Sequence, residues 1–222
     1  MFLFGNRRSR PALKTEVAGI VFDNPVGVSF SGGRLRESFA ACMGAGFITL
    51  EPPREGILEW IGKLQELHRK TVLAVNLPSD ILRRFSLVYD FADLIILDPD
   101  SDNGIDSPDI SDTSNLLEEV VSLRLCYEQY TPIFLRLSHG VTPDELHPLL
   151  AQSRLCGLDG IVASSLSQAR LVREETQGRV PLIGVADSPE TALKMLSEGV
   201  SLVETGFGSL HLNKLLKQLE KQ

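Results

Sequence analysis

The sequence predicts an α/β fold, a compact single-domain (β/α)8 TIM barrel, from three observations. Short apolar segments alternate with amphipathic segments along almost all of the 222 residues, as strands and helices do when they follow one another. The connections between these segments are short, which favours strand–helix units of a parallel sheet. The length suits one domain at the short end of the size range of such barrels.

Eight strand candidates are each followed by a helix candidate. The strands are expected at 25–30, 47–51, 71–76, 93–97, 132–137, 159–163, 181–185 and 201–205. The helices are expected at 34–43, 55–68, 79–89, 113–128, 143–154, 166–176, 189–197 and 209–219. Residues 15–23 predict a further strand ahead of this series, as part of a hairpin that closes one end of the barrel. We therefore divide the chain into an N-terminal segment, 1–14, and a barrel domain, 15–222.

Local signals agree with this order of elements. Thr142-Pro143 and Ser188-Pro189 place a hydroxyl cap before a proline at the first helical position. The strand candidate at 93–97 holds an unbroken apolar run, which is expected where both faces of a sheet are buried. A doubly wound open sheet is the alternative, but it rarely needs eight uninterrupted units, and no Gly-x-Gly-x-x-Gly fingerprint follows any strand candidate. The closed barrel is therefore favoured.

Composition and charge indicate which partners and which cellular compartment to expect. The net charge of -7 disfavours nucleic acid as a partner, because a phosphate binder needs a basic face. The apolar opening at 1–4 precedes its basic residues, which is the reverse of a secretory signal, and no later run approaches the length of a membrane span. We expect a cytoplasmic chain with no membrane partner, and the sequence leaves open whether it forms a homodimer. Three scattered cysteines are interpreted as reduced core thiols: Cys42, Cys126 and Cys156.

A series of short motifs then carries a resemblance to a known family. The motifs are Asn24-Pro25-Val26-Gly27-Val28, Met43-Gly44-Ala45-Gly46-Phe47, Ala74-Val75-Asn76, Thr131-Pro132-Ile133, Asp159-Gly160-Ile161-Val162-Ala163, Val180-Pro181-Leu182-Ile183-Gly184-Val185 and Gly199-Val200-Ser201-Leu202-Val203. In this order they resemble dihydroorotate dehydrogenases, and they span nearly the whole chain. The resemblance implies a barrel that binds flavin mononucleotide (FMN) and an oxidoreductase activity in pyrimidine biosynthesis.

The resemblance also assigns roles to individual positions. It places Asn76 at a flavin-contacting position and Arg136 where the family has a lysine near the reactive end of the flavin. Ser101 would stand at the catalytic base position of serine-type members, with Asn103 at a substrate-binding asparagine and Arg34 at a further lysine position. The other positions that the resemblance makes candidates for cofactor binding are Ser29, Ser165, Gly206 and Gly208.

Several replacements depart from the family pattern. Phe30 stands among residues that are small in the family and leave room for the flavin ring. Ala186-Asp187 replaces the Gly-Gly pair at the phosphate end, where a carboxylate repels a phosphate by about 1 kcal/mol in water and more in a sheltered site. Arginine in place of lysine at 136 changes reach and geometry. These replacements predict a degenerate active site that has lost ordinary FMN binding.

Polar residues at the ends of strands suggest a pocket independently of the resemblance. Arg136, Asp98 and Asp187 follow different strands and meet at the carboxyl end of a barrel, where functional sites lie, so we expect Asp98 and Asp187 to contact a small ligand. His139 follows the fifth strand and is a candidate acid or base near neutral pH. The acidic loop at 98–112 has some calcium-loop spacing but no closing glutamate, so we expect no metal.

Three functions remain to be compared. The leading hypothesis is a divergent barrel without flavin catalysis that binds a small molecule at its carboxyl-end face, or a protein partner. The second is an active FMN-dependent oxidoreductase of the dihydroorotate dehydrogenase type, with Arg136 near the flavin and Ser101 as base. The third is a non-flavin lyase or isomerase that uses Glu51, Asp98 and His139. Flavin absorbance separates the second from the others, and loss of turnover in His139→Ala would favour the third.

Overall fold

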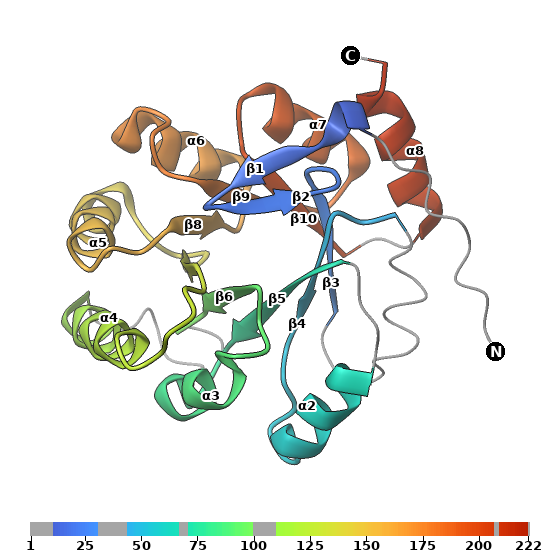
Figure 1. Ribbon diagram of the computed structural model, residues 1–222. Coiled ribbons are helices and arrows are strands. Elements are labelled where there is room, and N and C mark those ends of the chain that lie inside the picture. The colour runs from blue at the N-terminus through green and yellow to red at the C-terminus, as the bar shows by residue number, and fades with distance from the viewer. Residues whose placement is uncertain (1–10, 31–43, 67–70, 100–109, 207–208, 222) are drawn as a thin grey trace.

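Eight parallel strands close into a barrel in the computed structural model, which describes residues 11–30, 44–66, 71–99, 110–206 and 209–221 (Figure 1). The strands pair in chain order, and the last one closes the ring against the first. They are β3 (Val26–Phe30), β4 (Phe47–Leu50), β5 (Val72–Leu77), β6 (Leu94–Leu97), β7 (Ile133–Arg136), β8 (Gly160–Ala163), β9 (Leu182–Ala186) and β10 (Leu202–Thr205). The predicted barrel is confirmed.

Helices surround the barrel on its outside (Figure 1). They are α2 (Ile57–Glu66), α3 (Ile81–Val88), α4 (Ile110–Arg124), α5 (Pro143–Leu155), α6 (Leu166–Thr176), α7 (Pro189–Ser197) and α8 (Ser209–Leu219), with a short 3-10 helix, η1, at Pro11–Leu13. The helix expected at 34–43 lies outside the described residues. The helix expected at 113–128 was misplaced at both ends: α4 starts at Ile110, inside the predicted 98–112 loop, and ends at Arg124. Asp112 in its first turn suits the positive end of the helix dipole.

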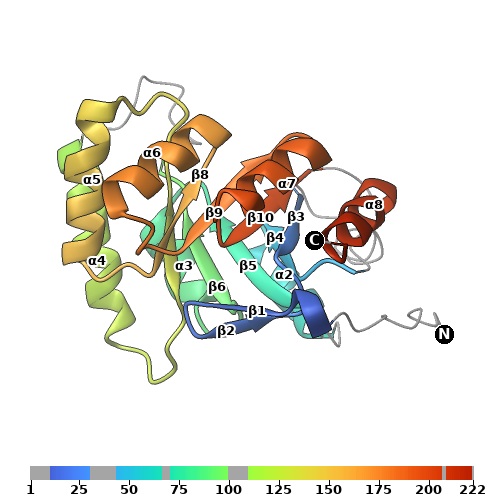
Figure 2. The ribbon, with the colours of Figure 1, turned by 90° about the horizontal axis from the view of Figure 1, so that it is seen from above.

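A hairpin closes the amino end of the barrel, as the sequence predicted. Its strands are β1 (Thr15–Val17) and β2 (Ile20–Phe22), which pair antiparallel. The two-residue turn has φ of 50° at Ala18 and 78° at Gly19, a left-handed conformation that matches the twist of a tight hairpin. Figure 2 shows the hairpin lying across one end of the strands. Val17 and Phe22 are buried against the barrel interior.

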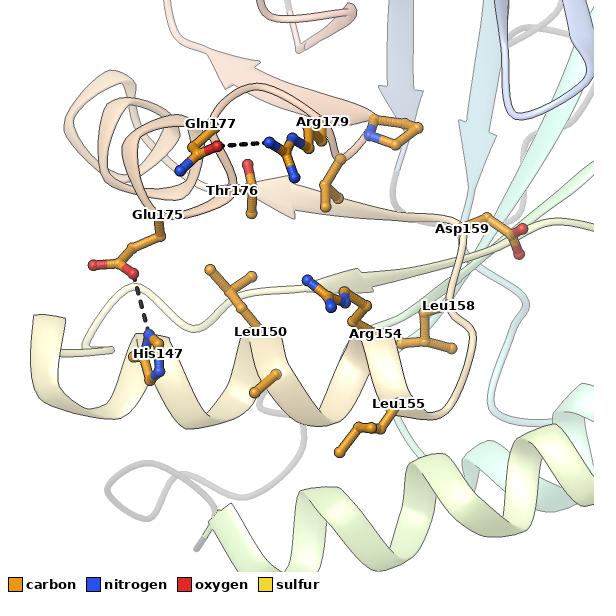
Figure 3. A pocket seen from close by; sticks show the side chains of 13 residues that line it. His147, Leu150, Arg154, Leu155, Leu158, Asp159, Glu175, Thr176, Gln177 and Arg179 are labelled. Carbon is orange, nitrogen blue, oxygen red and sulfur yellow. Dashed lines mark hydrogen bonds and ion pairs between the residues drawn. The ribbon is translucent and has the colours of Figure 1, made fainter.

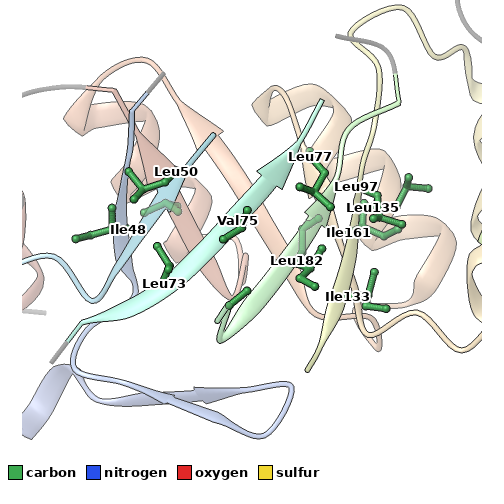
Figure 4. Packing of buried hydrophobic residues seen from close by; sticks show 14 of the residues in the cluster. Ile48, Leu50, Leu73, Val75, Leu77, Leu97, Ile133, Leu135, Ile161 and Leu182 are labelled. Atoms are coloured by element: carbon green, nitrogen blue, oxygen red, sulfur yellow. The ribbon is translucent and has the colours of Figure 1, made fainter. Parts of the chain in front are cut away.

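The strands alternate between an outer and an inner apolar layer. Outward residues of the strands pack against the helices, and Figure 4 shows part of this layer, including Val75 and Leu135. Inward residues such as Phe47 and Phe134 fill the barrel together with the hairpin residues. The two rings lie over glycines: a Cβ on Gly27 would come within 2.2 Å of the Phe47 ring, and one on Gly160 within 2.3 Å of the Phe134 ring. Glycine is therefore needed at both positions for the interior to pack.

The cysteines and the helices also bear on the predicted compartment. Cys126 is exposed and Cys156 is only half-buried, so the interpretation of these two as core thiols was wrong. Cys126 lies two residues after the end of α4, and Cys156, the residue after α5, packs against the outer apolar layer. Cys42 lies outside the described residues. Within the part of the chain that the structure describes, no helix combines the length and the apolar character needed to cross a membrane.

Candidate functional site

Five polar side chains meet inside the carboxyl end of the barrel. They come from five different strands or strand ends, and each lies two positions beyond an apolar inward residue. Side chains alternate along a strand, so these residues also point into the barrel. They form a polar layer next to the apolar one, on the side of the carboxyl ends of the strands. We call this set the mouth network: Thr49, Asn76, Asp98, Arg136 and Glu204.

Arg136 is the centre of the mouth network. Its Nη2 donates to Glu204 Oε1 at 3.0 Å, and its Nε lies 3.3 Å from Asn76 Oδ1 and 3.4 Å from Asp98 Oδ2. Asn76 Nδ2 in turn donates to Asp98 Oδ2 at 3.0 Å. The guanidinium thus has two carboxylate partners from opposite sides of the barrel. Such charge-assisted contacts fix the orientation of the arginine.

The Glu204 side of the network is buried deeply. Glu204 is 2% exposed, and its second oxygen accepts from Thr49 Oγ1 at 2.6 Å. An unpaired carboxylate at this depth would be strongly unfavourable, and Arg136 and Thr49 together supply its partners. The Asp98 side is wetter: the side chains of Arg136 and Asp98 are 16% and 14% exposed. Among the described residues of the network, Arg136 and Asp98 are therefore the pair that a ligand can reach.

Loops around the mouth are tied to one another by their own hydrogen bonds. Gln168 Nε2 donates to the Ser138 carbonyl at 2.7 Å, and Ser164 Oγ donates to the Leu137 carbonyl at 2.9 Å. Ser165 Oγ accepts from Gln168 N at 3.2 Å and so caps α6. On the opposite side, Arg84 donates to the carbonyl of Pro52 in the loop after β4. These contacts hold the rim near β4, β7 and β8 in place.

The N-terminus of α7 is occupied by the chain's own oxygens. Ser188 Oγ accepts from Thr191 N at 3.1 Å as the helix cap. Asp187 Oδ1 accepts from the Thr191 hydroxyl at 2.8 Å. A helix N-terminus after a late barrel strand is a common phosphate site because its free amides point outward. Here the Thr191 amide already has an acceptor and a carboxylate stands beside it.

The structure brings together only some of the residues that the sequence nominated. Arg136 and Asp98, two of the three residues of the predicted pocket, are in direct contact, and Asn76 joins them. His139 is exposed, with no hydrogen bond or ion pair to any described residue, and Asp187 contacts Thr191 at the rim and not Arg136. Ser29 lies half-buried at the end of β3. The nominated positions that lie outside the described residues are Arg34, Ser101, Asn103 and Gly208.

The steric objection based on Phe30 was wrong. Phe30 packs on the outer layer, together with Val26 and Val28 of the same strand. Because alternate residues of β3 face opposite ways, the inward positions are Gly27 and Ser29. The phenylalanine therefore leaves the barrel interior free, and the departures from the family pattern that matter lie elsewhere.

Two members of the mouth network were not among the nominated residues. Thr49 and Glu204 sit in short apolar strands, Phe47–Leu50 and Leu202–Thr205. A charged residue inside such a strand is rare unless it is paired, so Glu204 itself carried a signal. Nothing local in the sequence identifies its partners, because Thr49 and Glu204 are 155 residues apart.

Comparison with known proteins places this geometry in a family. No family profile matches the chain. A dihydroorotate dehydrogenase (quinone) from Aeromonas hydrophila is 25% identical over 286 aligned residues, which cover 92% of this chain and 85% of that protein. The chain is thus similar to dihydroorotate dehydrogenases over nearly its whole length, at low identity. A relative of the same name from Chloroflexus aurantiacus is 32% identical over 117 residues, 50% of this chain and 31% of its own length.

Solved structures of the family share the fold. The dihydroorotate dehydrogenase of Eimeria tenella in complex with ferulenol superposes with a TM-score of 0.77, covering 99% of this chain and 85% of that one at 16% identity. The ligand-free form of the Eimeria tenella enzyme gives a TM-score of 0.78 at 17% identity. The barrel is thus shared with the family while most side chains differ.

The flavin that the family implies does not fit the described contacts. Arg136 and Asn76, both at family flavin positions, are bonded to Glu204 and Asp98, so a flavin would have to displace a buried ion pair. At the phosphate end, the Thr191 amide is capped and Asp187 adds negative charge. Gly206 is the exception, since apart from its chain neighbours no atom of the described residues lies within 4 Å of the Cβ it lacks. We therefore derive no reaction step through FMN.

Proposed function

We propose that this barrel does not carry out flavin-dependent oxidation and instead binds a small polar ligand at its carboxyl-end mouth. The observation that carries the proposal is the double pairing of Arg136 with Glu204 and Asp98. It fills the flavin-facing position with the chain's own charges. An oxidoreductase needs those groups free to meet its cofactor.

The wet side of the mouth network defines the ligand chemistry. Arg136 offers a donor and Asp98 an acceptor, and both side chains retain some exposure. A ligand with an acceptor and a donor close together, such as an amide or a zwitterion, would satisfy both groups when it separates them. A phosphate dianion at this position would face the Asp98 carboxylate, and the one guanidinium there is already paired with Glu204. The charge balance therefore disfavours FMN and favours a neutral or zwitterionic compound.

The visible absorption spectrum tests the first half of the proposal. Purified protein is measured before and after incubation with excess FMN and desalting, and is then assayed for dihydroorotate-dependent reduction of an electron acceptor. We expect no retained flavin band and no reduction. A flavin band near one per chain would contradict the proposal and favour the FMN oxidoreductase, for which Asn76 and the open space at Gly206 are the supporting features.

Thermal unfolding tests the ligand half. Small amides and zwitterions are screened for stabilisation of the parent and of Asp98→Asn, which keeps the shape of the side chain and removes its charge. Stabilisation by mass action should appear in the parent and weaken in the variant. Equal stabilisation of both proteins, or none of the parent, would contradict a ligand held between Arg136 and Asp98.

A further inference from the structure

A groove lies between α5 and α6 on the opposite end of the barrel from the mouth. It is formed by the second half of α5, the end of α6, and the loops that lead into β8 and β9 (Figure 3). The groove is open on one side and has a volume of about 790 Å³, within the range of roughly 300–1,000 Å³ that small-molecule sites occupy. Neither the mouth network nor its rim contributes to it.

The floor and one edge of the groove are apolar. Leu150 is buried beneath it, Leu158 and Pro181 are half-buried beside it, and Leu155 stands at its edge with 82% exposure. Covering a large exposed apolar side chain with a ligand removes its apolar surface from water, which contributes favourably to the free energy of binding. The surface can therefore accept an apolar body.

Two arginines give the groove its charge. Arg154 extends from α5 and Arg179 from the loop before β9, and both reach into the space between these elements (Figure 3). Among the described residues, the Arg154 guanidinium has no hydrogen bond or ion pair, and the Arg179 guanidinium donates to the neutral Gln177 side chain alone, at 2.8 Å. Their positive charge is uncompensated by any described carboxylate.

The acids of the groove are already engaged. Glu175 pairs with His147 at 3.2 Å, across the groove from α6 to α5. Asp159 accepts from Arg124 at 3.2 Å, from the Ile133 amide at 2.9 Å, and from the Tyr130 hydroxyl. In a chain with a net charge of -7, two uncompensated arginines beside an apolar floor form a local positive site. Arginine favours carboxylate and phosphate groups because its donors match their geometry.

We propose that the α5–α6 groove binds a small amphipathic anion. The apolar body lies on Leu150, Leu158 and Pro181, and a carboxylate or phosphate head lies between Arg154 and Arg179. The charge complementarity of the two arginines selects an anion over an uncharged amphiphile. This site is independent of the proposed mouth ligand, since the two share no residue.

A pair of fluorescent probes tests the site. The anion 8-anilinonaphthalene-1-sulfonate and the uncharged N-phenyl-1-naphthylamine have similar apolar bodies and differ in the charged head. We expect the sulfonate to bind at one site per chain. In Arg154→Gln/Arg179→Gln its affinity should fall by about tenfold or more, with binding of the uncharged probe changed less than about twofold.

Two further variants locate the site. Arg83→Gln on α3 removes one exposed charge away from the groove and should leave sulfonate binding within about twofold of the parent. Ala151→Trp on the exposed groove wall should block both probes by filling the space. Thermal unfolding checks that each variant is folded, because loosely packed proteins also bind the sulfonate. Competition by octanoate and by octyl phosphate, with octanol as the uncharged control, then separates a carboxylate from a phosphate head.

Three results would overturn the proposal. The double arginine variant could bind the sulfonate as tightly as the parent. Ala151→Trp could leave both probes bound. Sedimentation velocity could show a dimer whose dissociation on dilution increases probe binding, in which case a second copy of the chain, and not a small anion, occupies the groove.

Discussion

The two ends of the barrel are closed in different ways. At the amino end, the hairpin places Val17 and Phe22 on the apolar interior, and the Phe22 ring meets the Phe47 ring edge-on with centroids 5.7 Å apart. At the carboxyl end, Arg136 and Glu204 close the same interior with an ion pair. Apolar closure contributes stability through burial alone, whereas ionic closure must offset the desolvation of both charges.

The difference indicates which end can exchange partners. The apolar side chains of the hairpin have no specific alternative partner, and displacing them would expose the barrel interior to water. A guanidinium and a carboxylate can each transfer their contacts to a ligand of suitable chemistry. This difference is why we place the proposed ligand at the carboxyl end, where functional sites lie in barrels of this kind.

The largest expected effect is on the apolar end. Phe22→Ala removes a fully buried ring and leaves a cavity between the hairpin and the barrel, so the free energy of unfolding should fall by about 4 kcal/mol. Chemical denaturation measures it. The control Val21→Ala, on the exposed side of the same hairpin, should change stability by less than about 0.5 kcal/mol. A small loss in Phe22→Ala would mean that the hairpin is not a plug.

Removing the ion pair at the carboxyl end should lower the free energy of unfolding somewhat less than Phe22→Ala does. Arg136→Met leaves the Glu204 carboxylate buried without its cation, and we expect a loss of about 3 kcal/mol. Adding Glu204→Gln removes that stranded charge and should recover most of the loss, since the side-chain amide can still accept from Thr49. If the double variant is no more stable than Arg136→Met, the pair is not coupled and the closure is not ionic.

A smaller effect is expected at the rim. Ser188→Ala removes the cap of α7 and should destabilise the fold by about 1 kcal/mol. Ser197→Ala, at the other end of the same helix, removes a hydroxyl that only donates to a carbonyl and should have less effect. Urea unfolding compares the two. Equal losses would show that Ser188 does not hold the helix N-terminus.

The smallest effect is a pH dependence at the amino end, outside the barrel. Burial, and then the hydrogen bond to Asp159, raises the pKa of Tyr130 to about 12 from the ordinary 10.0. The folded state thus favours the protonated phenol, so its contribution is complete below about pH 10 and is lost as the pH rises through about 12.

Tyr130→Phe should therefore lose less stability than the parent across this alkaline range, as measured by urea unfolding at several pH values. Tyr127→Phe is the matched control, because Tyr127 donates to the Ser86 carbonyl and has no carboxylate partner in the part of the chain that the structure describes. An identical pH dependence in the parent and Tyr130→Phe would contradict the Tyr130–Asp159 contact.

The fold could be predicted because its signals are local. Apolar runs, the caps at Thr142 and Ser188, and the glycines at helix ends each depend on a few neighbouring residues. The hairpin at 15–23 was also within reach, and only its turn at Ala18–Gly19 was not placed. The start of α4 was misplaced because the acidic segment before it is typical of a loop.

The site was predicted only in part because its contacts are not local. Asn76, Asp98 and Arg136 were nominated, but the residues that decide their state, Glu204 and Thr49, reach them only when the ring of strands closes. Phe30 was placed on the wrong face because its alternation along β3 was not followed from Gly27. Tracing the inward positions of every strand would have corrected that position and found Glu204.

The most direct test of the closed mouth is the nuclear magnetic resonance signal of the arginine Nε–H groups, recorded with and without excess FMN. The signal of Arg136 is assigned by its absence in Arg136→Lys. The ion pairs with Glu204 and Asp98 predict a slowly exchanging Nε–H that shifts in Glu204→Gln and does not move when FMN is added. A rapidly exchanging Nε–H, or one displaced by FMN, would contradict the account and show a mouth open to the flavin.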